Sequence, residues 1–184
     1  MPNQVTIAID PGTVDCGFAL MVDGQLKHYA KLHAPERRPL HVRMALIMGQ
    51  LSQITNHLVG LNNDVDLVYE RPIYMRSTPT AHMSRVGIST NELWMLIGAM
   101  VHWANERDYR PIGYDVDEIK EGIGGKKNAS KALVMQSLRH DPVVSTLVAD
   151  NKLSDHEWDA ISVAIYHQAM RRVQEATIEG DPRK

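Results

Sequence analysis

The stretch that decides the fold is IAIDPGTVDCGFALMV, residues 7–22. An apolar run ends on Asp10, breaks at the pair Pro11-Gly12 and resumes at Gly17. A carboxylate at the tip of a buried strand is costly to desolvate, so its charge must be compensated. The candidates for that compensation are a metal ion, a phosphate bound through the following turn, and a simple turn cap.

The alternation of apolar segments and breakers continues along the chain and predicts an α/β protein. Strands are expected at 5–10, 16–22, 25–32, 65–69 and 110–115, with a hairpin turn at Asp23-Gly24. Helices are expected from residue 40 to about residue 60 and at 90–105, 129–138 and 155–173. Residues 71–89 and 117–127 are expected to be connectors without regular structure. This order predicts a layered α/β fold with a mixed sheet.

Composition and charge restrict the class of protein. The chain has 184 residues, which predicts one domain, and its formal net charge of -2 argues against a polycation that simply coats nucleic acid. Cys16 is the only cysteine, so an intrachain disulfide is excluded and a reducing compartment is expected. No apolar stretch approaches the roughly 20 residues that span a bilayer. A cytoplasmic location is expected.

Two acids end predicted strands, and a third candidate pair lies on the last helix. Asp10 and Glu70 follow strands, at the edge of an open α/β sheet where ligands bind. His156 and Asp159 are three residues apart and can share one helix face. Each strand-end acid alone is also explained as a solvent-facing residue. Together, carboxylates with one imidazole favour Mg²⁺ or Mn²⁺ over structural zinc.

Two other acids near the start of the last helix have simpler explanations. Glu157 lies three residues after Ser154, which is the spacing of a capping box. Asp155 lies in the first turn, where a negative charge complements the helix dipole.

Several features in chain order resemble one known family. They are Asp10-Pro11-Gly12 followed by Gly17, the strand-end Glu70, Lys120 ahead of Gly122-Ile123-Gly124 with Lys131 beyond, and Asp159-Ala160 in the last helix. Together they resemble the RuvC-type Holliday-junction resolvases, whose fold is that of ribonuclease H. The resemblance covers nearly the whole chain. It implies a ribonuclease H-like mixed five-stranded sheet flanked by helices, with residues 1–176 as one nuclease domain and 177–184 as a flexible tail.

The resemblance also implies the catalytic residues and the reaction. The family's four acidic positions fall on Asp10, Glu70, His156 and Asp159, so this chain carries histidine at the third position. Lys120 and Lys131 are the implied active-site lysines. Lys127 is the alternative to Lys131, because the segment between Gly124 and Lys131 is longer than is usual in the family. The implied activity is paired, symmetric nicking of four-way DNA junctions with Mg²⁺, for which Mn²⁺ substitutes.

The 71–89 connector is basic and follows Glu70 directly, so it is expected to project over a bound DNA. The expected DNA contacts are Arg71, Tyr74, Arg76, Arg85, Lys126 and Lys127. Resolvases of this type stack an aromatic residue on a base near the crossover. Ile73 stands at the expected offset, and we choose the neighbouring Tyr74 because stacking needs a ring. A solvated loop is the alternative reading of the arginines.

The helix at 90–105 is apolar around most of its circumference, more than a helix on one face of a sheet needs. It is expected to form a two-fold dimer, as the resemblance implies, with Ile97 and Met100 in the interface. The alternative is a central helix buried within one chain.

Two rival functions remain. Asp10, Gly12 and Thr13 also resemble the phosphate loop of sugar kinases and actin-like ATPases, but those proteins need two such domains around the nucleotide. A branched-DNA-binding protein without catalysis is the second rival, because His156 replaces an acid.

Overall fold

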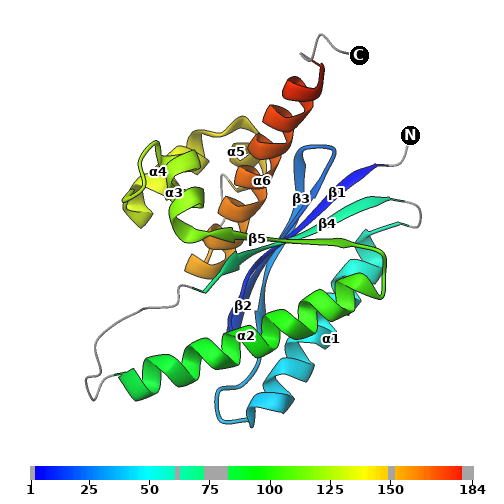
Figure 1. Cartoon of the computed structure of the whole chain (residues 1–184), viewed down its shortest axis with the longest axis vertical. Coiled ribbons are helices and arrows are strands. Elements are labelled where there is room, and N and C mark those ends of the chain that lie inside the picture. The colour runs from blue at the N-terminus through cyan, green and yellow to red at the C-terminus, as the bar shows by residue number, and fades with distance from the viewer. Residues whose placement is uncertain (1–2, 61–62, 73–82, 149–151, 180–184) are drawn as a thin grey trace.

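A five-stranded mixed sheet forms the centre of the computed structural model, which describes residues 3–60, 63–72, 83–148 and 152–179 (Figure 1). Its strands are β1 (Gln4–Asp10), β2 (Asp15–Val22), β3 (Gln25–His33), β4 (Asp64–Arg71) and β5 (Arg110–Asp115), in the spatial order β3-β2-β1-β4-β5. Strand β2 is antiparallel to β1 and β3, whereas β4 is parallel to β1 and β5. The five predicted strands are confirmed.

Helices cover both faces of the sheet. One face carries α1 (Leu40–Leu58) and α2 (Met83–Asn105), and the other carries α3 (Val116–Gly124), α4 (Lys131–His140), α5 (Pro142–Val148) and α6 (Asp155–Glu179) (Figure 1). Each layer has its own core of buried apolar side chains. Among the described residues, no helix is long and apolar enough to cross a membrane.

The two-residue period of the strands assigns each side chain to one layer. In β1, Ile9 packs into the core under α1 and α2, whereas Ala8 packs into the core under α6. In β4, Val68 likewise faces the α6 layer. Asp10 and Glu70 lie two residues beyond Ala8 and Val68, so their side chains leave the strands on the α6 side.

The hairpin turn between β2 and β3 forms as predicted. Asp23 and Gly24 both have positive φ, 50° and 74°, which is the backbone of the tight turn that the Asp-Gly pair favours. The side chain of Asp23 also accepts a hydrogen bond from the main-chain N–H of Gln4 at 2.9 Å.

Three predicted boundaries are wrong. Helix α2 begins at Met83, seven residues before the expected start at residue 90, so part of the expected 71–89 connector is helical. The expected 117–127 connector contains α3, which begins with a capping box formed by Asp115 and Glu118. Helix α6 continues to Glu179, so it extends into the segment expected to be a flexible tail.

The surplus of apolar residues in α2 divides between two faces. Ile97 and Met100 are 2% and 1% exposed, so both are buried within the single chain, and Met100 belongs to the core between this helix layer and the sheet. Trp94 and Met95 are 37% and 58% exposed on the outer side. The assignment of Ile97 and Met100 to a dimer interface is therefore wrong, and the alternative of a helix buried all round is wrong as well.

A buried polar network fastens α6 to the far half of the sheet. The carboxylate of Asp66 is fully buried and accepts two hydrogen bonds from Arg110, at 2.8 and 2.9 Å. It also contacts His167 Nε2 at 2.9 Å and accepts a hydrogen bond from Arg171 at 3.0 Å, both from α6. The other ring nitrogen of His167 lies 2.7 Å from the hydroxyl of Tyr114. This end of α6 is thereby fixed against β4 and β5.

Candidate active site

Asp10 and His156 come together because Gly17 lets α6 lie directly on β2. Asp10 is the register partner of Gly17 across the β1–β2 ladder. A Cβ atom on Gly17 would overlap the carbonyl oxygen of His156 and contact the methyl group of Ala160. The first turn of α6 therefore rests on bare main chain, and His156 Nδ1 lies 2.7 Å from Asp10 Oδ2.

The contact with Asp10 influences both the protonation and the tautomer of the His156 imidazole. The hydrogen bond to Asp10 raises the pKa of His156 above its ordinary value, against the opposing effect of partial burial. When Nδ1 donates to Asp10, the neutral ring presents the lone pair of Nε2. An imidazole held this way by a carboxylate can bind a metal or accept a proton through Nε2.

The start of α6 is capped as predicted. The carboxylate of Glu157 accepts a hydrogen bond from the Ser154 main-chain N–H at 2.7 Å, and the Ser154 hydroxyl lies 3.4 Å from the Glu157 N–H. This capping box fixes where the helix begins, and therefore where His156 and Asp159 lie.

Four of the residues predicted to act in catalysis line one cavity of about 190 Å³. They are Glu70 from β4, Lys120 from α3, Lys131 from α4 and Asp159 from α6. The other lining residues are Val116, Ile119, Val134, Met135 and Ser162. The pair Asp10–His156 does not line this cavity, but Asp10 is close enough to influence both acids electrostatically.

Lys131 is the lysine that reaches the acids. Its Nζ lies 2.7 Å from Asp159 Oδ2 and 3.3 Å from Asp155 Oδ2. Although burial opposes the ammonium, these two carboxylates raise its pKa. Lys127 instead lies 3.9 Å from Asp117, on the α3 side. Of the two alternatives left open by the sequence, the geometry favours Lys131.

The surroundings of the cavity disfavour the ionised form of its two acids. Burial, followed by repulsion from Asp10 and Asp159, raises the pKa of Glu70 to about 7, although Lys120 and Lys131 act in the opposite direction. Burial also raises the pKa of Asp159, in spite of its hydrogen bond from Lys131. A cation would relieve this excess of negative charge.

The residues fit a divalent metal by chemistry, but they are not preassembled around one. Among the described residues, no three histidine, cysteine or carboxylate side chains converge closely enough to form a metal site. Lys131 and His156 instead pair with Asp159 and Asp10. Carboxylate oxygens with one imidazole nevertheless suit Mg²⁺ or Mn²⁺, and the raised pKa of Glu70 indicates that positive charge is lacking.

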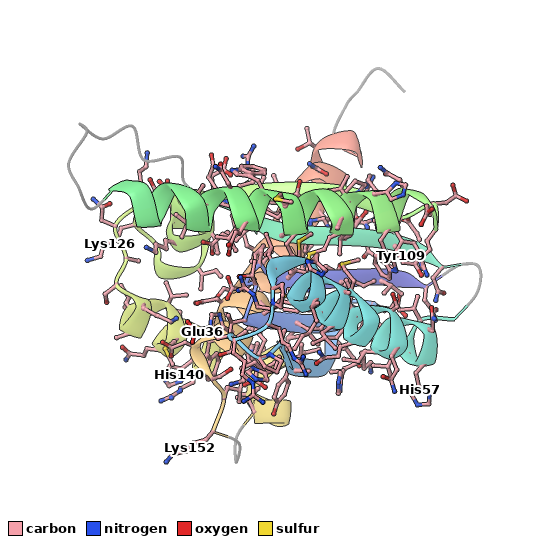
Figure 2. The ribbon with its side chains drawn as sticks, turned by 90° about the horizontal axis from the view of Figure 1, so that it is seen from below. Glu36, His57, Tyr109, Lys126, His140 and Lys152 are labelled. Atoms are coloured by element: carbon pink, nitrogen blue, oxygen red, sulfur yellow. The ribbon has the colours of Figure 1, made fainter. Side chains whose placement is uncertain are left out.

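The expected DNA contacts are placed only in part. Arg71 lies 3.0 Å from Asp115 and 3.8 Å from Glu118, so its charge is paired within the protein. Lys126 projects from the turn after α3, at the end of the molecule opposite Tyr109 (Figure 2). Tyr74, Arg76 and the side chain of Arg85 lie outside the described residues, so their predicted contacts remain predictions.

Arg43 lies near the site and was not predicted from the sequence. Arg43 of α1 donates a hydrogen bond to the hydroxyl of Thr13 at 2.8 Å and another to Glu92 of α2 at 3.2 Å. It therefore ties the turn after Asp10 to both helices of that layer. No local pattern marks this arginine, because its two partners are far away in sequence.

Comparisons with known proteins identify the fold. No protein-family model matches the sequence. A curated crossover junction endodeoxyribonuclease RuvC from Brachyspira hyodysenteriae is 20% identical over 175 residues, which are 92% of this chain and 97% of that protein. A structure of T. thermophilus RuvC in complex with Holliday junction substrate matches with a TM-score of 0.72 at 17% identity, over 93% of this chain and 96% of that one. The fold is that of RuvC.

Two further solved structures share the RuvC fold. A second structure of Thermus thermophilus RuvC matches with a TM-score of 0.66 at 19% identity, over 93% of this chain and 97% of that one. The yeast mitochondrial Holliday junction resolvase Ydc2 matches with a TM-score of 0.52 at 15% identity, over 94% and 82% of the two chains. The resemblance to RuvC-type resolvases and the ribonuclease H-like sheet predicted from the motifs are confirmed.

Proposed function

We propose that this protein is a metal-dependent endonuclease that resolves four-way DNA junctions by paired, symmetric nicking. The observation that carries the proposal is the cavity in which Glu70, Asp159, Lys120 and Lys131 meet, beside the Asp10–His156 pair. The similarity to RuvC over 92% of the chain supports the choice of substrate. A kinase-like function finds no such support, because the cavity lies within one small α/β unit.

Asp10, Glu70 and Asp159 would hold a divalent ion, Mg²⁺ or Mn²⁺, with His156 as a fourth ligand through Nε2. The bound ion supplies Lewis-acid stabilisation of negative charge at the scissile phosphate. Lys120 and Lys131 add positive charge at the same cavity, where they can stabilise negative charge that develops on the phosphate. If His156 does not bind the metal, its Nε2 accepts a proton from the attacking water.

Two exposed lysines, Lys126 and Lys152, lie on the side of the molecule away from Tyr109 and His57 (Figure 2). Such lysines suit the phosphates of a junction arm, although the whole chain carries a net charge of -2.

The decisive experiment is metal-dependent nicking of a synthetic four-way junction, with a linear duplex of the same sequence as competitor. Paired nicks that require Mg²⁺ or Mn²⁺ support the proposal. Tight junction binding without any nick would favour the rival, a branched-DNA-binding protein, because His156 then replaces an acid that catalysis needs. Equal treatment of the junction and the duplex would overturn both functions.

We also propose a dimer through the outer face of α2, since two symmetric nicks require two active sites. Trp94 and Met95 supply the exposed apolar surface there. Met95→Lys should give a monomer by light scattering at micromolar concentration. Val173→Lys is the matched control, because Val173 is equally accessible, at 60%, but lies on α6. A monomeric wild type under the same conditions would contradict the dimer.

A further inference from the structure

A second cavity, of about 510 Å³, lies next to the candidate active site. Its lining residues are Met135, Arg139, Ser145, Val148, Lys152, Leu153 and Trp158. Met135 also lines the cavity of Glu70 and Asp159, so one side chain borders both. Trp158 of the second cavity and Asp159 of the first are consecutive residues of α6, so the two cavities lie on either side of the same turn of helix.

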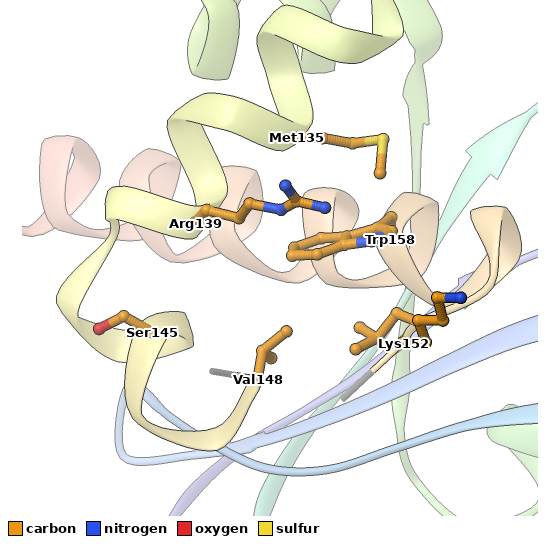
Figure 3. A pocket seen from close by; sticks show the side chains of 7 residues that line it. Met135, Arg139, Ser145, Val148, Lys152 and Trp158 are labelled. Atoms are coloured by element: carbon orange, nitrogen blue, oxygen red, sulfur yellow. The ribbon is translucent and has the colours of Figure 1, made fainter. Parts of the chain in front are cut away.

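The lining combines positive charge with an aromatic floor. Trp158 is only 3% exposed, and the guanidinium of Arg139 lies over its ring, 5.6 Å from the centroid (Figure 3). This contact holds the guanidinium at the cavity by a cation–π interaction. Lys152 projects from the segment before α6 on another side of the same space (Figure 3).

Within the part of the chain that the structure describes, Arg139 and Lys152 form no ion pair with a carboxylate, whereas Arg71, Lys127 and Lys131 all do. Two unpaired positive charges on one concave surface attract an anion. Val148 and Leu153 form apolar walls of the same cavity. The cavity therefore suits a ligand that carries an apolar or planar group as well as an anion.

We propose that this cavity is a nucleotide subsite, which holds one nucleotide of the DNA strand next to the scissile phosphate. Arg139 and Lys152 contact its phosphate, and its base or sugar lies against the apolar walls. The volume is within the range of about 300–1,000 Å³ that small ligands occupy. The inference rests on the proposed function, because the strand must already be bound at the neighbouring cavity.

The test compares the salt dependence of junction binding, measured without divalent ions so that no strand is cut. In the double variant Arg139→Gln/Lys152→Gln, the slope of log affinity against log salt should become shallower by about one. Affinity should fall on the order of tenfold at low salt, the cost of one charge-assisted contact.

Matched controls separate a local contact from a change in net charge. Arg107 also lies over a tryptophan ring, 4.6 Å from the centroid of Trp103, but at the far end of α2. Lys27 is an exposed lysine in the β2–β3 hairpin region. Arg107→Gln/Lys27→Gln removes the same two charges and should keep the wild-type slope. Thermal unfolding of both double variants verifies that they fold.

Neutral methylphosphonate linkages then locate the contact. One linkage close to the scissile phosphate should weaken wild-type binding and leave binding of the Arg139→Gln/Lys152→Gln variant unchanged. Such a result is a coupling between that phosphate and the two cations.

Equal salt slopes, together with equal effects of every linkage on both proteins, would overturn the subsite. If a deoxynucleoside monophosphate stabilises wild type but not this variant while the slopes are equal, the cavity binds a free nucleotide and the DNA assignment is wrong. Wild-type protein that neither binds nor nicks junctions would instead refute the proposed function.

Discussion

Gly17 of β2 lies directly against the main chain of His156, so that a methyl group at residue 17 would overlap the His156 carbonyl oxygen. The close approach places the imidazole 2.7 Å from Asp10, although 146 residues separate the two in sequence. The absence of a side chain at Gly17 therefore allows the Asp10–His156 contact in the candidate site.

The first prediction is that Gly17→Ala folds but loses cleavage. The added methyl group must push the first turn of α6 away from β2, which costs about 1–3 kcal/mol of unfolding free energy. A displacement of about 1 Å at the site should lower the cleavage rate on the order of 100-fold. Denaturant unfolding and single-turnover cleavage measure the two effects. Gly49→Ala is the control, because a Cβ at Gly49 meets no atom within 4 Å.

The second prediction concerns Glu70 in protein without divalent ions. Its pKa, raised to about 7 from 4.5, means that ionising Glu70 in the folded state destabilises the fold as pH rises through this range. Glu70→Gln should therefore raise the unfolding free energy at pH 8, on the order of 1 kcal/mol, while abolishing cleavage. Urea unfolding at pH 5 and pH 8 provides the measurement.

The effect of divalent ions on the unfolding temperature tests whether Asp10, Glu70 and Asp159 bind a metal. Millimolar Mg²⁺ or Mn²⁺ should raise the unfolding temperature of wild type, because an ion that binds only the folded state stabilises it. The increase should disappear in Asp10→Asn, Glu70→Gln and Asp159→Asn, all of which should lose cleavage while still binding junctions. An undiminished increase in any one variant would remove that residue from the metal site.

Local sequence patterns predicted most of the architecture. The Asp23-Gly24 turn and the Ser154–Glu157 cap are formed by residues at most three apart, so their chemistry is visible in a short window. Helix α3 was missed because its glycines suggested a connector, although Asp115 and Glu118 form a capping box at its start. Such a box outweighs the low helix propensity of glycine over a few residues.

The sequence indicated which candidate residues to consider, but not which of them contact one another. Strand-end positions and the motif indicated Asp10, Glu70 and Asp159 from sequence. That Lys131 rather than Lys127 contacts Asp159 depends on where α4 packs, which no spacing reveals. Ile97 and Met100 were misjudged for a similar reason, since apolar character alone does not distinguish the face that packs on the sheet from the one that meets solvent.

The third prediction ranks the lysines. Lys131→Met should reduce the cleavage rate on the order of 100-fold, because it removes a positive charge from the cavity of Glu70 and Asp159. Lys120→Met should act in the same direction, since Lys120 lines that cavity too. Lys127→Met should change the rate little. A change confined to the salt dependence of binding would make Lys120 and Lys131 peripheral phosphate contacts.

The fourth prediction concerns the buried Asp66 network. Burial alone would raise the pKa of Asp66, but hydrogen bonds from His167 and Arg110 outweigh it and lower the pKa to about 2. This group therefore stabilises the fold above about pH 4, and the contribution is lost as pH falls towards 2. Asp66→Asn should cost about 3 kcal/mol at pH 7, because it removes the buried carboxylate that Arg110, His167 and Arg171 share.

Acid unfolding measures this contribution. The loss of stability between pH 4 and pH 2 should be smaller in Asp66→Asn than in wild type. Asp108→Asn is the control: Asp108 is exposed with φ of 57°, a conformation that asparagine tolerates. Identical acid profiles for Asp66→Asn and wild type would show that the network does not determine stability in this range.

The last prediction concerns His156, where the chain departs from an all-carboxylate site. The hydrogen bond to Asp10 raises the pKa of His156, so protonation blocks Nε2 at a higher pH than in an ordinary histidine. The cleavage rate should therefore fall on acidification, with a titration that is lost in His156→Asp. That variant should retain activity, because an acid fits the family pattern, and its activity should extend to lower pH. His156→Ala should be severely impaired, since it removes both the ligand and the partner of Asp10. Full activity of His156→Ala with the wild-type pH profile would leave catalysis to Asp10, Glu70 and Asp159 alone.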